Sequence, residues 1–124
     1  MLKHYREDRG NLSCLDFNEL DFKPKRIYYV SDVPLGEIRG QHGHKKDRQY
    51  LICLRGKIEV KMITKESIIV TILNEGDSCL LDIWTWGEQK YLAEDSIMLV
   101  LCSEEYDPDE YIHNIDEIFE RNSN

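Results

Sequence analysis

Short apolar and alternating runs follow one another along this chain, with turn residues between them. In the clearest run, Ile58, Val60 and Met62 alternate with charged residues, a pattern typical of a half-buried strand. Other strand-like runs occupy residues 26–30, 50–54, 68–73 and 97–102. Many short strands without intervening helices predict an all-β fold, either an antiparallel barrel or a double-sheet jelly roll.

Only the C-terminal end has a helical pattern. Asp107 is a candidate N-cap, Pro108 suits the first helical position, and Glu110 completes a capping box. Apolar residues then recur at helical spacing, at positions 111, 115 and 118. We therefore expect a short C-terminal helix with one face docked on the barrel.

The length of 124 residues predicts a single domain spanning residues 1–124, and 41% hydrophobic residues suit a globular protein. No apolar run approaches the length of a membrane span, and the first residues lack the apolar core of a signal peptide. These features predict a cytoplasmic protein without membrane association. Its four cysteines are then expected to be reduced, mostly as core residues.

The net charge of −8 argues against nonspecific nucleic-acid binding, but the charges are unevenly distributed. Residues 39–65 hold eight of the 16 basic residues and only two acids, whereas residues 104–120 hold eight acids and no Lys or Arg. A cationic segment in an acidic protein suits a small anionic ligand, such as a phosphorylated one. Lys57, Glu59 and Lys61 are expected to form only a solvated strand face.

The segment from Gly36 to Gly56 carries the most specific motif, G-x5-H-x-H-x4-Q-x6-G. Residues two apart on a strand point to the same face, so His42 and His44 are expected side by side. Two such imidazoles can bind a metal, move a proton or form a structural pair. The spacing is that of the first motif of the cupin barrels, which makes the predicted fold a cupin-type jelly roll.

Two departures from the metal-binding cupins favour proton transfer over metal binding. Gln49 stands where those proteins carry Glu, and residues 76–88 contain no further His. A stable transition-metal site usually takes at least three protein ligands. We therefore expect no metal, and acid–base use of the two histidines.

Several segments together resemble the sugar 3,4-ketoisomerases, cupin enzymes of the dTDP-4-oxo-6-deoxyglucose 3,4-ketoisomerase group. The matching segments are residues 8–12, 26–29, 39–45, 49–56 and 100–111. The resemblance implies a metal-free enzyme without a cofactor that works as a homodimer with exchanged N-terminal strands. It would move the ketone of a dTDP-linked 4-keto-6-deoxy sugar from C4 to C3. The product would serve deoxysugar biosynthesis for bacterial surface glycans such as lipopolysaccharide.

The same resemblance implies roles for individual residues. The family's base corresponds to His42 and its second essential histidine to His44. Arg39 and Tyr29 match positions that line the sugar pocket, while Arg9 and Arg26 match positions expected near the diphosphate. Independently of the family, an enediolate requires donors where negative charge develops, and Arg39, Tyr29 and the Gln49 amide are suitable types.

One segment departs from the family pattern. Trp86 and Glu88 correspond to a family Trp and Glu and are candidate substrate-binding residues, although Trp86 fits a packing role equally well. Ile83 stands in place of a Pro, and Gly87 in place of a cationic residue. These differences bear on the configuration of the product at C4.

Two other functions remain open. A dTDP-sugar 3,5-epimerase would act on the same substrate but leave the ketone in place, and Gln49 counts against it because a nearby Lys is expected there. A non-catalytic sugar-binding cupin would bind the ligand without turnover, so that changing His42 would alter no reaction rate.

Overall fold

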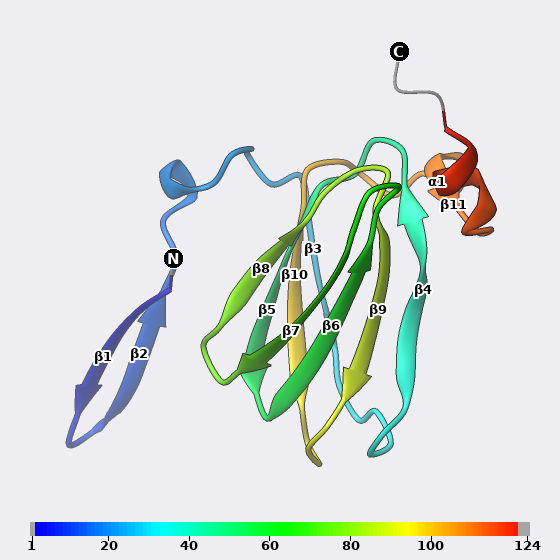
Figure 1. Cartoon of the computed structure of the whole chain (residues 1–124). Helices are drawn as coiled ribbons and strands as arrows, with labels where there is room; N and C mark the ends of the chain where they lie inside the picture. The colour runs from blue at the N-terminus through cyan, green and yellow to red at the C-terminus, as the bar shows by residue number, and fades with distance from the viewer. Residues whose placement is uncertain (1, 122–124) are drawn as a thin grey trace.

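The computed structural model describes residues 2–121, which form two facing antiparallel sheets with a small hairpin and a short helix beside them (Figure 1). One sheet has the order β3-β10-β5-β8 and the other β11-β4-β9-β6-β7. The strands are β3 (Arg26–Val30), β4 (Ile38–His44), β5 (Gln49–Arg55), β6 (Lys57–Ile63), β7 (Ile68–Asn74), β8 (Ser78–Leu81), β9 (Trp86–Tyr91), β10 (Ile97–Cys102) and β11 (Tyr111–Ile112). The predicted cupin-type jelly roll is confirmed.

The main core lies between the two sheets. Ile58 and Val60 of β6 are fully buried there, as the alternation of this run predicts, and they pack with Leu51 of β5 and Val100 of β10. All four cysteines are free thiols, and Cys53 and Cys102 are buried. Within residues 2–121, no helix is long and apolar enough to cross a membrane.

Strand β4 contains a bulge directly before the first histidine of the motif. Gly40 pairs with Glu88 and His42 with Gly87, so one extra residue, Gln41, is inserted on β4. Gly40 and Gln41 both have positive φ angles, +87° and +58°. Because of the extra residue, side chains before and after the bulge no longer follow one continuous alternation along β4.

The C-terminal end differs from the predicted helix. Pro108–Glu110 form only a 3-10 turn, although the Asp107 carboxylate does accept a hydrogen bond from the Asp109 N–H. Tyr111–Ile112 then form strand β11 and pair with β4, and helix α1 spans only Asp116–Glu120. The prediction of a helix beginning at residue 108 was wrong because long-range contacts of residues 110–112 override the local capping pattern.

The C-terminal helix packs on the barrel with one face, as the sequence predicts. Ile118 of α1 is buried, and Ile115 packs beside it against Ile63, Trp86 and Ile112 on the outer face of the β4–β9–β6 sheet. In Figure 1, α1 and β11 lie beside the upper end of β4.

The N-terminal hairpin of β1 (Lys3–Glu7) and β2 (Gly10–Cys14) forms a two-stranded sheet of its own and projects from the barrel (Figure 1). Its Tyr5 and Leu12 lie opposite each other and are more than half exposed. The segment after it, which includes the 3-10 turn Phe17–Glu19, covers the outer face of the β3–β10–β5–β8 sheet with Leu15, Leu20 and Phe22.

Candidate active site

A cavity of about 70 Å³ lies between the sheets, at the motif of the two histidines. Its polar side chains come from β3, β4, β5 and β9, and its apolar wall from β3, β5, β8 and β10. The lining residues include Tyr28, Arg39, His42, Gln49, Gln89 and Tyr91 on the polar side, and Val30, Leu51, Leu81 and Met98 on the apolar side.

His42 is held with one ring nitrogen turned back toward its own strand. Its Nδ1 lies 3.0 Å from the carbonyl oxygen of Gly40, and because a carbonyl only accepts, Nδ1 carries the proton. Nε2 of the neutral ring is therefore left with its lone pair. Burial and the neighbouring His44 lower the pKa of His42 below 6.5, so the ring is neutral at pH 7 and suited to accept a proton.

His44 lies beside His42, as the alternation predicted, with ring centroids 5.0 Å apart. It is only 1% exposed and is not among the residues that line the cavity. Its Nδ1 lies 2.5 Å from Oε2 of Glu110, while its Nε2 is buried without a hydrogen-bond partner among the described residues. His44 thus contacts the candidate base and is itself oriented by a carboxylate.

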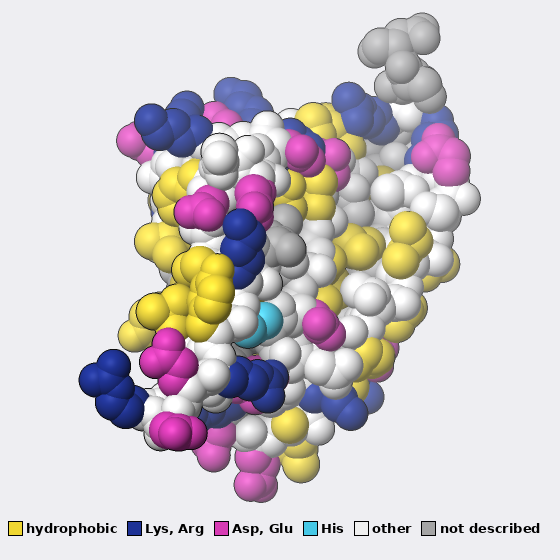
Figure 2. Space-filling view, turned by 90° about the vertical axis from the view of Figure 1, so that its left-hand side faces the viewer, with side chains coloured by type: hydrophobic (Ala, Val, Ile, Leu, Met, Phe, Trp, Pro, Cys, Tyr) yellow, Lys and Arg dark blue, Asp and Glu magenta, His cyan; other side chains and the backbone are white. Residues whose placement is uncertain are grey.

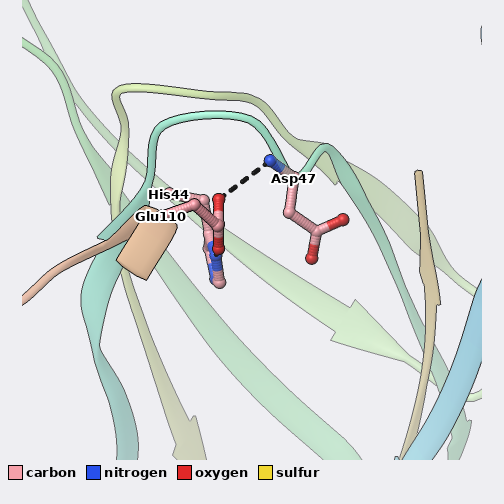
Figure 3. Close-up of side chains that lie close together, drawn as sticks. All are labelled: His44, Asp47 and Glu110. Carbon is pink, nitrogen blue, oxygen red and sulfur yellow. Dashed lines mark hydrogen bonds and ion pairs between the residues drawn. The ribbon is translucent and has the colours of Figure 1, made fainter. Parts of the chain in front are cut away.

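Glu110 is buried, and its carboxylate is fully used. Oε1 accepts hydrogen bonds from the backbone N–H groups of Lys46 and Asp47, each at 3.0 Å, and Oε2 bonds to His44. Burial alone would raise the pKa of Glu110, but these hydrogen bonds outweigh it and lower the pKa below the usual value. Figure 3 shows the carboxylate between the His44 ring and the Asp47 backbone.

A second buried carboxylate, Asp47, ties the base of β5 to β3. Its Oδ2 accepts hydrogen bonds from Arg26 Nη2 at 3.0 Å and from the Gln49 amide at 2.9 Å. Its Oδ1 accepts a hydrogen bond from the backbone N–H of Glu104. We refer to Arg26, His44, Asp47 and Glu110 as the carboxylate network.

The network brings three potential metal ligands together, since ring nitrogen and carboxylate oxygen atoms of His44, Asp47 and Glu110 lie within 4.8 Å of one another. Every one of the four carboxylate oxygens, however, already accepts a hydrogen bond from an N–H donor or bonds to His44. The carboxylate of Asp47 points away from that of Glu110 (Figure 3). This donor set suits a hydrogen-bonded scaffold rather than a cation, and the prediction of a metal-free site stands as a prediction.

The structure assigns the pocket position on β3 to Tyr28 rather than to Tyr29. Tyr28 lines the cavity, whereas Tyr29 is on the opposite face of the strand and 69% exposed. The sequence prediction for Tyr29 therefore needs correction by one residue. Burial, with the nearby Cys102 and Tyr111, raises the pKa of Tyr28 far above that of a free phenol, which keeps its hydroxyl protonated as a donor.

Arg39 shares the cavity with His42 although the two are three residues apart. On a regular strand they would face opposite sides, and the extra residue Gln41 in the bulge brings them to the same side. The guanidinium is also close enough to Tyr91 to oppose, in part, the burial that raises the pKa of that phenol to about 12. Gln49 lines the cavity as well and is buried.

Other predicted site residues lie elsewhere in this chain. Trp86 packs against Ile63 and α1 on the outer face of its sheet, and its Nε1 donates to Glu88 Oε2 at 3.1 Å on the same side of β9. Arg9 is exposed in the turn of the N-terminal hairpin. Arg26 is half-buried and engaged with Asp47, so it is not a free cation. None of these four residues is among those that line the cavity.

Sequence reasoning missed Glu110 and Asp47 of the network and Tyr28, Gln89 and Tyr111 near the histidines. Tyr111 pairs with His44 across β11 and β4, with ring centroids 4.5 Å apart. Glu110 was interpreted as part of a helix-capping pattern, which gave no sign of its contact with His44. Asp47 belongs to no recognisable sequence motif. Tyr28 differs from the adjacent Tyr29 only in the face of β3 to which its side chain points.

The fold and the site define a class: a cupin-type barrel with a neutral imidazole and a protonated phenol at one cavity. The family model "FdtA: WxcM-like, C-terminal" matches residues 1–123. The chain is 34% identical over 113 residues to TDP-4-oxo-6-deoxy-alpha-D-glucose-3,4-oxoisomerase of Aneurinibacillus thermoaerophilus, which covers 89% of this chain and 81% of that protein. The chain belongs to this family of cupin sugar ketoisomerases.

Solved structures agree with that assignment. QdtA, a sugar 3,4-ketoisomerase from Thermoanaerobacterium thermosaccharolyticum in complex with TDP, has a TM-score of 0.88 and 31% identity, covering 95% of this chain and 88% of its own. The WlaRB TDP-quinovose 3,4-ketoisomerase from Campylobacter jejuni has a TM-score of 0.87 and 34% identity, covering 97% and 94%. The family predicted from the sequence is confirmed, and with it the class of enzyme, a sugar 3,4-ketoisomerase.

Proposed function

We propose that this enzyme moves the ketone of a dTDP-linked 4-keto-6-deoxyhexose from C4 to C3 by acid–base catalysis without a metal. The observation that carries the proposal is the cavity shared by a neutral His42 with a free Nε2 and a protonated Tyr28. The match to TDP-sugar 3,4-ketoisomerases supports the substrate class.

The reaction requires two proton shifts. Nε2 of His42 takes the proton from C3, the electrons of that C–H bond form the C3–C4 double bond, and the C4 carbonyl oxygen becomes an enolate. Protonation of that oxygen gives an enediol. Loss of the proton from the C3 hydroxyl and return of a proton to C4 complete the exchange, so no electron donor or acceptor is needed.

The cavity provides donors where this negative charge develops. Tyr28, which its surroundings keep protonated, donates to the enolate oxygen, and the guanidinium of Arg39 adds a positive charge at the same side. The Gln49 amide, held in place by Asp47, lines the same cavity from β5. In this proposal His44 acts through His42: it keeps that ring in place and helps to hold its pKa low.

The diphosphate requires cations, and the candidates are Arg39 at the cavity and Arg9 of the hairpin. Arg9 reaches a cavity only if the hairpin belongs to a second copy of the chain, as in a homodimer with exchanged N-terminal strands. Three features support such a dimer: the hairpin pairs with no barrel strand in residues 2–121, β3 is an edge strand, and its Ile27 is 60% exposed. Figure 2 shows hydrophobic side chains gathered in patches on the hairpin side of the molecule.

A reaction in deuterated water tests the proposal. The protein is incubated with dTDP-4-keto-6-deoxyglucose, and the position of the ketone and of incorporated deuterium is read by NMR. We expect a C3 ketone with solvent deuterium at C4. Exchange confined to C3 and C5, with the ketone still at C4, would identify a 3,5-epimerase, and binding without exchange a non-catalytic sugar-binding cupin. In this proposal the enzyme acts in the cytoplasm, in deoxysugar biosynthesis for surface glycans.

A further inference from the structure

The side chain of Gln89 is largely buried, and it lines the cavity without a hydrogen-bond partner among the described residues. Gln89 is 6% exposed and lines the cavity beside His42. Among the described residues, no hydrogen bond to its side chain is present. An amide has two donor hydrogens and an acceptor oxygen, and here they remain available to a molecule in the cavity.

Two glycines make room for this amide. A β-carbon on Gly40 would lie 2.7 Å from Gln89 Oε1 and 3.1 Å from its Nε2, and one on Gly87 would lie 3.4 Å from Nε2. Gly87 is directly opposite His42 in the β4–β9 register. The amide therefore lies in a slot between two backbone segments, within the immediate surroundings of the base.

The space at Gly87 is a matter of side-chain volume rather than of backbone conformation, because its φ angle is not in the left-handed region. A β-carbon there would lie 2.8 Å from a Leu81 methyl group. The wall next to His42 thus offers one polar group, the Gln89 amide, and one apolar group, the Leu81 side chain. A ring carbon that carries a hydroxyl suits the side of this wall with the Gln89 amide, and a carbon without one suits the side with Leu81.

We infer that Gln89 is a specificity-determining residue that hydrogen-bonds an oxygen substituent of the sugar ring and so fixes which face of the ring meets His42. This inference rests on the proposed function for the identity of the ligand, a nucleotide-linked sugar. A sugar hydroxyl or carbonyl satisfies the amide that the protein leaves unpaired. TDP alone, which lacks the sugar, leaves the amide as it is.

Binding measurements in a variant that cannot turn over test the inference. In a His42→Asn background, the affinities for TDP and for TDP-4-keto-6-deoxyglucose are measured by calorimetry with and without Gln89→Met, which keeps the length of the side chain. We expect the affinity for TDP to stay unchanged and that for the sugar nucleotide to fall about 3- to 10-fold, the effect of one lost neutral hydrogen bond. Lys90→Met, which places the same side chain on the exposed face of β9, is expected to change neither affinity.

Thermal unfolding of the ligand-free protein provides a second readout. Because Gln89→Met removes an amide that forms no hydrogen bond with the described residues, the midpoint of unfolding should stay the same or rise. A fall in the midpoint, an equal loss of affinity for both ligands, or no loss for either would overturn the inference. If wild-type protein fails to move the ketone while the sugar-specific loss of affinity is observed, the proposed reaction fails and the role of Gln89 stands.

Discussion

Two groups of polar residues meet at the histidine motif, and they differ in how their hydrogen bonds are used. In the carboxylate network, all four oxygens of Asp47 and Glu110 have partners within the protein. On the cavity wall, His42 Nε2 and the Gln89 amide have none among the described residues. The two carboxylates hold β3, β4, β5 and the C-terminal segment together, and the groups on the cavity wall are available to a ligand. Polar groups alone thus do not mark a catalytic site; unpaired polar groups that line a cavity do.

The strongest test of the difference is His42→Asn, which keeps the volume and a hydrogen bond but removes the titratable base. Loss of a general base typically reduces the rate by about 10²–10⁴. We expect kcat to fall by that factor while the affinity for TDP, measured by calorimetry, is nearly unchanged. A variant that keeps more than about a third of the wild-type turnover would show that His42 is not the base.

Adjacent tyrosines provide a matched pair for the cavity wall. Tyr28→Phe removes the phenol that faces the cavity, and by analogy with the loss of one oxyanion donor kcat should fall about 10²- to 10³-fold. Tyr29→Phe changes the outward residue and should retain wild-type turnover. The two variants are compared by initial rates on the same substrate, and the reverse ranking would refute the assignment of Tyr28.

The carboxylate network is tested through stability rather than rate. Glu110→Gln removes a charge that accepts three hydrogen bonds, and leaving one buried donor unsatisfied costs about 1–3 kcal/mol. Urea unfolding should show a loss of that size, whereas the exposed control Asp109→Asn should cost much less. If both variants are equally stable, the network is not what holds the C-terminal segment.

The pH dependence of kcat/KM tests whether His44, a member of the carboxylate network, lowers the pKa of His42 on the cavity wall. The base must be neutral, and because its pKa is lowered, the acidic limb of the profile should lie below pH 6.5. Since His44 is one cause of that lowering, His44→Gln should raise the pKa of His42 and move the limb to higher pH. An unmoved limb would mean that burial alone sets the pKa.

Removal of metal ions should have the smallest effect. After exhaustive dialysis against a chelator, we expect unchanged activity, because the oxygens of the carboxylate network are occupied by N–H donors. Metal analysis of the purified protein should find no stoichiometric transition metal. Activity that disappears with the chelator and returns with one divalent ion would make His44, Asp47 and Glu110 a metal site.

Local sequence patterns predicted most strands of both sheets. They did not predict a strand whose inward residues line the cavity instead of packing in the core. Strands β5, β6, β7 and β10 follow from alternating or apolar runs. Strand β9 was missed because it turns Gly87 and Gln89 inward, where a packed strand would carry apolar residues. The residues that serve the cavity are the ones that disrupt the pattern of the strand.

The site was predictable where residues are close in sequence. His42, His44, Arg39 and Gln49 all come from one segment, and three of them line the cavity. Glu110 was not, because its contacts with residues 44–47 span more than sixty positions and compete with a plausible local capping pattern. Tyr28 and Tyr29 are chemically identical, and each face of β3 carries an aliphatic residue beside its tyrosine, so composition could not separate them.

The bulge on β4 has a consequence for how the length of this segment can vary over evolutionary time. Residues 31–37 form the connection that leads into β4, and an insertion or deletion there leaves the relation between Arg39 and His42 unchanged. If Gln41 were instead paired in a regular ladder at unchanged chain length, Arg39 and His42 would face opposite sides, whereas a deletion of Gln41 would leave Arg39 opposite Gln89 and His42 opposite Gly87, on the same side. Selection is therefore expected to accept two residues with the bulge, or one residue without it, between the arginine and the histidine, and to disfavour two residues in a regular ladder.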